Sequence, residues 1–150
     1  PLAAFWGANA LDHDLRPRVR AYTAAYRAIG EQVQALSQPQ DRLLVWGNSP
    51  EIYHFAGRRM GTRFVFCNYH SGKIWGTDAD LEGAPRRPDL AVPEAWRMLL
   101  DDLDTRPPEI IVDAAAAGLD RWAGHALSTC PGSSGGSRAT MPCSARPRGP

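Results

Sequence analysis

Short apolar runs and longer amphipathic stretches alternate along this chain of 150 residues, and no other feature limits its possible folds as strongly. Apolar runs within 42–46, 62–68 and 109–113 have the length of β-strands. Amphipathic stretches at 17–37 and from Pro93 onward have the length of helices. Alternation of this kind favours helices layered on a parallel sheet. We therefore predict an α/β fold, a small three-layer, Rossmann-like domain with a short, mainly parallel sheet.

The segment 17–37 carries the clearest helical pattern. Its apolar residues recur at spacings of three and four, which places them in one stripe on a helix. They are Val19, Tyr22, Tyr26, Ile29, Val33 and Leu36. Pro17 suits the first turn of a helix, and Pro39 follows shortly after the last turn. The sequence thus predicts a helix over 17–37 that docks through this stripe on the rest of the domain.

A strand-to-helix turn follows the run 42–46, which we predict to be a buried strand. Within the turn Gly47–Glu51, Ser49 stands where a side chain can cap the next helix, and Pro50 suits the first helical position. We expect a short helix here that ends at Gly57 in a left-handed conformation.

The run 62–68 is nearly continuously apolar, which is typical of a strand covered on both faces. The connection 47–61 is long enough for a crossover between parallel strands, which needs about a dozen residues. Residues 69–92 have no clear period and contain several glycines and prolines. We predict a long loop there, of the functional or mobile kind.

Beyond this loop the pattern predicts a helix that opens at Pro93, a strand over 109–113 and a last helical segment from Leu119. The helix from Pro93 is expected to turn four apolar residues toward the core, namely Trp96, Leu99, Leu100 and Leu103. Its acidic residues, Asp101, Asp102 and Asp104, are interpreted as a solvated face.

Charge and composition divide the chain into unlike parts. The formal net charge of +1 gives no basic surplus of the kind that nucleic-acid binding needs. The charged residues after position 124 are all arginines, namely Arg138, Arg146 and Arg148. Residues 128–150 are rich in Gly, Ser, Pro and Arg, so we predict a disordered tail. No apolar run reaches the roughly 20 residues that span a bilayer. Because the chain begins with Pro1 rather than Met, we expect it to be part of a longer protein.

Polar and aromatic side chains gather at the predicted carboxyl ends of the strands, where α/β sheets collect ligands. The turn Gly47–Glu51 offers a helix N-terminus that attracts anions, but Pro50 removes one donor, and a well-capped turn without a ligand is the simpler interpretation. Tyr69 and Trp75 could stack on a sugar ring, anchor the loop or meet a partner. The candidate ligand-binding residues are Asn48, Ser49, Glu51, Asn68, Tyr69, His70, Lys73, Trp75 and Asp113.

The sequence holds no complete catalytic set. It lacks the Gly-x-Ser-x-Gly elbow, the Walker loop and the His-Glu-x-x-His pair. Cys67 and His70 are close enough in sequence to share a metal, but the second ligand pair of a structural zinc site is missing. We interpret Cys67 as a small core residue, and Cys130 and Cys143 define no disulfide framework. We therefore predict neither a metal nor a cofactor.

Several segments together resemble a known family. They are Asp41–Arg59, with the sequence DRLLVWGNSPEIYHFAGRR, then Thr62–Phe66, Trp96–Leu103 and Arg106–Asp113. Preceded by a helix, this pattern resembles the domain that follows the membrane spans in bacterial membrane glycosyltransferases of the protein-mannosyltransferase-like group, which use polyprenyl-phosphate sugars. The likeness covers about residues 17–120. It ends after about Leu127, where the tail stands in place of a closing strand.

The resemblance implies a soluble C-terminal domain on the extracytoplasmic face of the bacterial inner membrane, within a longer membrane protein. Residues 1–16 would be a membrane-proximal lead-in and 17–127 an α/β accessory domain. The catalytic acid and the donor site would lie in the transmembrane part, so this fragment would be non-catalytic and hold no cofactor. Its partners would be the transmembrane domain of the same polypeptide and, through the loop 69–92, the polyprenyl-phosphate sugar or its acceptor, but no nucleic acid.

Two other functions stay open from the residues alone. The chain could be a free-standing Rossmann-like α/β protein that binds an anionic small molecule at Gly47–Glu51. It could also be a protein-interaction module whose contact surface is the loop 69–92 with Trp75. A start codon directly before Pro1 would argue against the membrane enzyme, and thermal stabilisation by sugar phosphates or nucleotides would argue for the anion-binding protein.

Overall fold

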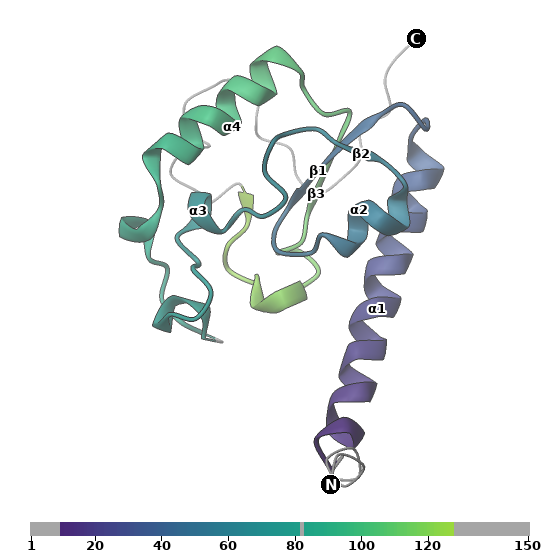
Figure 1. The fold of residues 1–150 in the computed structure, drawn as a ribbon, viewed down its shortest axis with the longest axis vertical. Coiled ribbons are helices and arrows are strands. Elements are labelled where there is room, and N and C mark those ends of the chain that lie inside the picture. The colour runs from purple at the N-terminus through teal and green to yellow at the C-terminus, as the bar shows by residue number, and fades with distance from the viewer. Residues whose placement is uncertain (1–9, 82, 128–150) are drawn as a thin grey trace, which may run out of the picture.

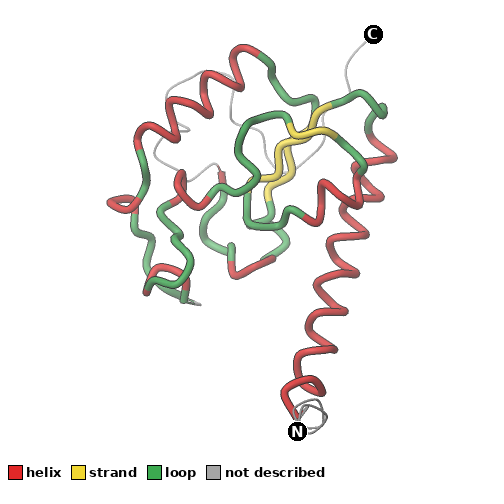
Figure 2. The backbone as a smooth tube through the Cα atoms, viewed as in Figure 1, coloured by secondary structure: helices red, strands yellow, loops and turns green. Residues whose placement is uncertain are grey.

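A computed structural model describes residues 10–81 and 83–127, and the structural statements below concern these residues. Figures 1 and 2 show one long helix and a rounded body built on a small sheet. The helices are α1 (Ala10–Leu36), α2 (Glu51–Ala56), α3 (Asn68–Ser71) and α4 (Pro93–Thr105), and the strands are β1 (Arg42–Trp46), β2 (Arg59–Met60) and β3 (Ile110–Asp113). Short 3₁₀ turns lie at Asp78–Asp80, Pro88–Leu90 and Leu119–Arg121.

The sheet is parallel, with β1 in the middle of the order β2-β1-β3. β1 pairs with β3 along its whole apolar run, from Leu43 opposite Ile110 to Trp46 opposite Asp113. Its pairing with β2 is confined to the first two residues of β1. From Leu43 to Trp46 every side chain of β1 is at most 1% exposed, because helices and loops cover both faces of the sheet. The α/β class and the parallel sheet are thus confirmed.

The strand predicted over 62–68 is wrong. In the described part of the chain β2 is limited to Arg59–Met60, and the apolar run that follows it is irregular backbone. This run still packs on the sheet, since the Cys67 N–H donates to the carbonyl of Gly47 at 3.1 Å and its Sγ lies 3.6 Å from the carbonyl of Val45. A short continuous apolar run fits a buried loop as well as a buried strand, so its periodicity could not separate the two.

α1 begins at Ala10, earlier than predicted, so Pro17 lies inside the helix rather than at its start. An interior proline removes one backbone hydrogen bond and crowds the carbonyl four residues before it, which is why the sequence favoured a helix start at this position. The second half of α1 packs on the body through Tyr26 and Val33, which are buried. Val19 and Tyr22, in contrast, are 59% and 40% exposed. With a length of about 40 Å, α1 projects well beyond the body, and its N-terminus lies at the far end (Figure 1).

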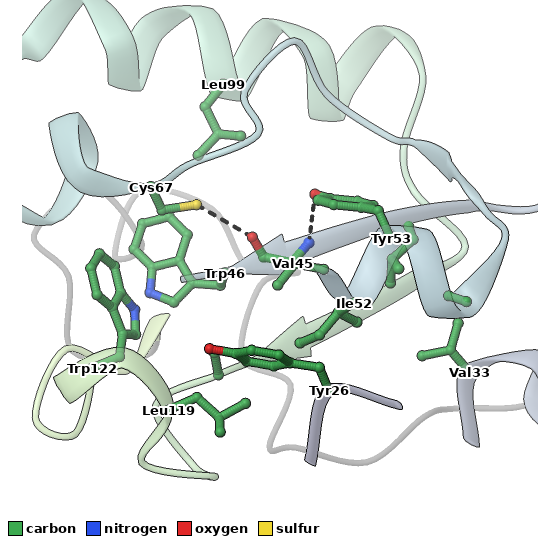
Figure 3. Packing of buried hydrophobic residues seen from close by; sticks show 13 residues of the cluster. Tyr26, Val33, Val45, Trp46, Ile52, Tyr53, Cys67, Leu99, Leu119 and Trp122 are labelled. Atoms are coloured by element: carbon green, nitrogen blue, oxygen red, sulfur yellow. Dashed lines mark hydrogen bonds between the residues drawn. The ribbon is translucent and has the colours of Figure 1, made fainter. Parts of the chain in front are cut away.

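The core lies between β1, the end of α1, α2 and α4, and Figure 3 shows its packing. The Tyr53 hydroxyl accepts a hydrogen bond from the backbone N–H of Val45 at 2.9 Å, which fastens α2 to the central strand. Burial raises the pKa of Tyr53 to about 12. α2 ends where the sequence predicted, at Gly57, which has a φ of 58°. Gly30 lets α1 and α2 touch, because a Cβ there would lie 2.5 Å from the Cβ of Phe55.

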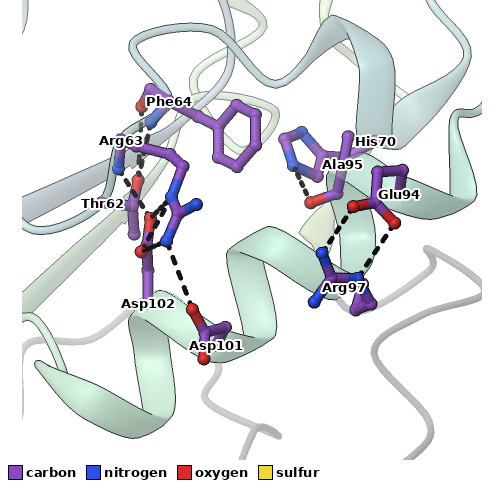
Figure 4. A network of polar contacts seen from close by, with 9 residues as sticks. All are labelled: Thr62, Arg63, Phe64, His70, Glu94, Ala95, Arg97, Asp101 and Asp102. Carbon is purple, nitrogen blue, oxygen red and sulfur yellow. Dashed lines mark hydrogen bonds and ion pairs between the residues drawn. The ribbon is translucent and has the colours of Figure 1, made fainter.

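α4 opens at Pro93 as predicted, but two residues on its faces differ from the expectation. Leu100 is 49% exposed rather than turned to the core. The acidic face is solvated at Asp101 and Asp104 as expected, but Asp102 is half-buried, and its carboxylate accepts hydrogen bonds from the backbone N–H of Arg63 at 2.8 Å and from its guanidinium at 2.6 Å (Figure 4). This partner lies far away in the sequence, so the helical pattern could not predict it. The segment from Leu119 forms a 3₁₀ turn instead of a longer helix.

The predicted disordered tail, 128–150, and residues 1–9 of the predicted lead-in lie outside the described residues. Within the described ranges, none of the helices combines the length and the apolar character that crossing a bilayer requires.

Candidate functional site

Four of the predicted site residues meet at the carboxyl end of β1. Asn48 follows this strand, Asn68 opens α3, and Lys73 and Trp75 lie just beyond that short helix. Asn48 and Asn68 are 5% and 7% exposed. Because the carboxyl ends of parallel strands are where α/β folds place their ligands, this cluster is the candidate functional site.

A chain of side-chain hydrogen bonds connects the cluster. When the amide of Asn48 is oriented to suit its neighbours, its oxygen accepts from Asn68 Nδ2 at 2.9 Å and from the indole Nε1 of Trp75 at 2.8 Å. Its nitrogen donates to Asn68 Oδ1 and to the carbonyl of Gly47, the latter at 3.2 Å. Asn68 Nδ2 also donates to the carbonyl of Lys73 at 2.6 Å. Both amides are thus paired with each other and with the loop that carries Trp75.

Trp75 is 53% exposed, although its one polar atom is already bound to Asn48. The ring of Phe66 meets it edge to face, with centroids 5.1 Å apart. The indole is therefore held at its nitrogen and along its ring, while about half of its surface faces solvent. The sequence had singled out Trp75 but not Phe66, whose partner could be known only from the fold.

Lys73 is placed as a structural cation. Its side chain is 1% exposed, and Nζ lies 3.5 Å from Asp80 Oδ1 and 3.3 Å from the carbonyl of the same residue. A third oxygen, the carbonyl of Ala79, lies at 3.5 Å. These contacts tie the 3₁₀ turn Asp78–Asp80 to the loop after α3, so the ammonium group is not offered to a ligand at the surface.

His70 belongs to the core. Its ring meets Phe64 edge to face at a centroid distance of 4.5 Å and also packs on Trp46 and Trp96. Nε2 donates to the carbonyl of Ala95 at 3.1 Å (Figure 4), and burial lowers the pKa of the ring. His70 is therefore a neutral residue that joins α3 to the start of α4.

Tyr69 is the exposed neighbour of His70 in α3. Its side chain is 55% exposed, and its carbonyl accepts a hydrogen bond from the N–H of Val92 at 2.7 Å. The backbone at this position is thus fixed to the end of the loop 69–92, while the ring remains available to solvent.

The remaining predicted residues are separated from this cluster or used by the fold. Ser49 is fully buried, and its backbone carbonyl accepts a hydrogen bond from the N–H of Ile52 at 3.2 Å. α2 begins at Glu51 with Pro50 as its N-cap, one residue later than the sequence predicted. Asp113 binds two backbone N–H groups, those of Ala115 at 3.0 Å and Leu127 at 2.8 Å.

The turn after β1 thus offers little to an anion. The N–H groups of Ile52 and Tyr53 are bonded to carbonyls within the turn, and Pro50 has none. Glu51 is exposed at the start of α2 and adds a negative charge there. Because α2 has only six residues, its dipole at this end is also weak.

Two buried residues behind Gly47 escaped the sequence analysis. Trp122 and His125 are at most 5% exposed, and Trp122 Nε1 and His125 Nδ1 have no hydrogen-bond partner among the described residues. A Cβ on Gly47, whose φ is 154°, would lie 2.6 Å from the Cβ of Ala114, so only glycine fits between them. Burial lowers the pKa of His125, and the charge of Lys73 adds to this effect. No local signal in the sequence connects these residues to the turn after β1.

A surface hollow of about 360 Å³ lies at the opposite, amino end of β1. Its lining includes Arg42, Arg63, Arg106 and Asp102. The charges are largely compensated, since Arg63 pairs with Asp102 at 2.6 Å and Arg42 lies 3.8 Å from Glu109. Two of the three arginines that line the hollow are therefore already held in ion pairs within the protein.

Among the described residues, no three His, Cys, Asp or Glu side chains come close enough to hold a metal ion. Comparisons with protein-family models, with curated proteins and with solved structures found no match for this chain. The carboxyl end of β1 thus presents a fixed and half-exposed indole over a buried pair of amides.

Proposed function

We propose that this chain is a non-catalytic accessory domain of a bacterial membrane glycosyltransferase that uses a polyprenyl-phosphate sugar, and that its sheet is a reduced form of the three-layer, Rossmann-like arrangement. The observation that carries this proposal is that the N-terminus of α1 and the carboxyl ends of the strands lie toward the same end of the molecule. The N-terminus of α1 lies at one end of the long axis of the molecule (Figure 1). The turns Asp78–Asp80 and Leu119–Arg121, beyond the carboxyl ends of the strands, lie on the side of the body toward that same end.

This arrangement suits a domain attached to a membrane through α1. A helix that continues from a membrane span at its N-terminus would turn the carboxyl end of the sheet, with Trp75, toward the membrane. The donor lipid and the transmembrane domain of the same polypeptide would be found there, on the extracytoplasmic face. Val19 and Tyr22, exposed on the projecting half of α1, would then contact that domain.

The segments that carry the family resemblance also coincide with the centre of the fold. Residues 41–59 form β1, the following turn and α2, and residues 106–113 end in β3, which pairs with β1. The likeness therefore follows the parts of the chain that build the sheet and that position the candidate site.

The DNA upstream of the codon for Pro1 tests the proposal most cheaply. It is expected to continue in frame and to encode several apolar segments of about 20 residues each. The full-length protein in membranes should transfer a sugar from a polyprenyl-phosphate donor to an envelope acceptor, whereas the 150-residue chain alone should not. A start codon directly before Pro1 would refute the membrane origin, and transfer by the isolated chain would refute the non-catalytic role.

A protein-interaction module is the second candidate function, and the exposed apolar residues of the loop 69–92 favour it. Tyr69, Trp75 and Leu81 are each more than half exposed. Under this alternative they would contact a separate protein, and alanine at these positions would abolish that complex without any effect on sugar transfer.

A further inference from the structure

The half-exposed side chain of Trp75 is fixed by several contacts with the rest of the protein. Its indole nitrogen donates to Asn48, its ring rests against Phe66, and Asn68 binds the carbonyl of Lys73 just before it. Trp75 itself lies in a turn, in which the N–H of Thr77 donates to the carbonyl of Ile74 at 3.3 Å. An indole fixed in this way loses little conformational entropy when a ligand covers it.

The surface that Trp75 leaves exposed is apolar, because its nitrogen is already used inside the protein. The flat face of an indole matches the C–H face of a pyranose ring. Stacking buries apolar area on both partners while the sugar hydroxyls keep their contacts with water. An indole offers a large area for such contact, since a buried aromatic side chain removes about 150–250 Å² of its surface from water.

The residues that follow Trp75 in the chain are open to solvent and polar. No atom lies within 4 Å of the position that a Cβ on Gly76 would occupy, so there is space beside the next residue. Asp78 follows closely, with its side chain 76% exposed and paired to Arg87 at 3.4 Å. Carboxylate and guanidinium groups can hydrogen-bond sugar hydroxyls.

We propose that the exposed part of the Trp75 indole binds a pyranose ring of the sugar substrate, with Asn48 as the residue that positions the indole. The identity of the sugar as substrate rests on the proposed function above. The stacking itself rests only on how the indole is held and on what it exposes.

Titration of the isotope-labelled 150-residue chain with methyl α-D-mannopyranoside and with α-mannotriose tests this proposal. The indole N–H resonance of Trp75 is expected to shift saturably, and the trisaccharide should bind at least as tightly. Trp75→Ala should weaken binding by a factor of ten or more, while Trp75→Phe, which keeps an aromatic face, should retain part of it. Tyr22→Ala, which removes a half-exposed aromatic ring on α1, is the matched control and should bind as the unmodified chain does.

Asn48→Ala separates positioning from direct contact. The variant keeps the indole but releases its nitrogen, so sugar binding should fall several-fold while the Trp75 indole resonance broadens or moves in the absence of sugar. Far-ultraviolet circular dichroism checks that each variant is folded.

Absence of a saturable shift with either sugar, or equal binding by Trp75→Ala, would overturn this inference. Neither result bears on the upstream DNA or on the transfer assay, which decide the proposed function. Conversely, sugar binding that depends on Trp75 in a chain without upstream membrane spans would support the inference and refute the membrane enzyme.

Discussion

Replacing Asn48 with alanine should lower the free energy of unfolding of this chain by about 2–4 kcal/mol. The side chain is 5% exposed and shares two hydrogen bonds with Asn68 and one with Trp75. Its loss leaves the buried amide of Asn68 short of a donor and an acceptor, and an unsatisfied buried group costs about 1–3 kcal/mol. The bond from Trp75 adds less, because this side chain is half exposed and water can reach it.

A double-mutant cycle isolates the contact between the two amides. Asn68→Ala alone should cost about as much as Asn48→Ala, since it orphans Asn48 and also releases the carbonyl of Lys73. The double variant leaves neither amide unsatisfied, so the two losses should overlap. We expect a coupling free energy of about 1–3 kcal/mol between the two positions.

Urea unfolding followed by far-ultraviolet circular dichroism measures all four free energies. Thr23→Ala combined with Asn48→Ala serves as the control pair, because the Thr23 hydroxyl bonds within α1, to the carbonyl of Val19 at 2.8 Å. This control pair should be additive. If the losses from Asn48 and Asn68 also add to within about 0.5 kcal/mol, the two amides do not form the buried pair described above, and the argument that Trp75 is fixed through them fails.

Three further predictions concern the turn, the core and pH. Gly47→Ala should lower the free energy of unfolding by about 3 kcal/mol or more, because a Cβ there would lie 2.6 Å from the nearest side-chain carbon. Gly76→Ala is the control: its φ is 76° but it lies in open space, so it should cost only about 1–2 kcal/mol. Equal losses for the two variants in urea unfolding would contradict this reasoning. Tyr53→Phe orphans the buried N–H of Val45 and should cost about 1–3 kcal/mol, so an unchanged melting temperature would refute the role of that hydroxyl. Burial lowers the pKa of His70, so below a pH of about 6.5 the unfolded chain binds more protons than the folded chain, and the free energy of unfolding should fall. This fall should be smaller in His70→Phe. Identical dependence of the unfolding free energy on pH in the two proteins would contradict the prediction.

The elements that the sequence located correctly are those whose signals are local. β1 and β3 are short apolar runs between turn residues, and α4 opens at a proline with an acid after it. The stop of α2 depends on one glycine at the position that needs a left-handed backbone. Each of these signals acts within a few residues, so the pattern alone was sufficient.

The errors arose where a distant partner decided the outcome. The run 64–67 packs against β1 without joining the sheet, and Asp102 is held by Arg63 from that same region. Lys73, which the sequence offered as a ligand-binding cation, is buried against Asp80 instead. In each case the charge or the apolar character was visible in the sequence, but its partner was not.

The sequence by itself determined the α/β class of this protein and the placement of Asn48 and Asp113 at the carboxyl ends of β1 and β3. Both follow from periodicity and turn chemistry, which act over short distances along the chain. Only the tertiary structure decided which residues meet at these ends. The end of β1 and the start of α3 come together because Cys67 bonds to Gly47, and this contact brings Asn48 to Asn68 and aims the indole of Trp75 outward. Such a pairing depends on how the chain returns across the sheet, and no spacing within the sequence specifies that path.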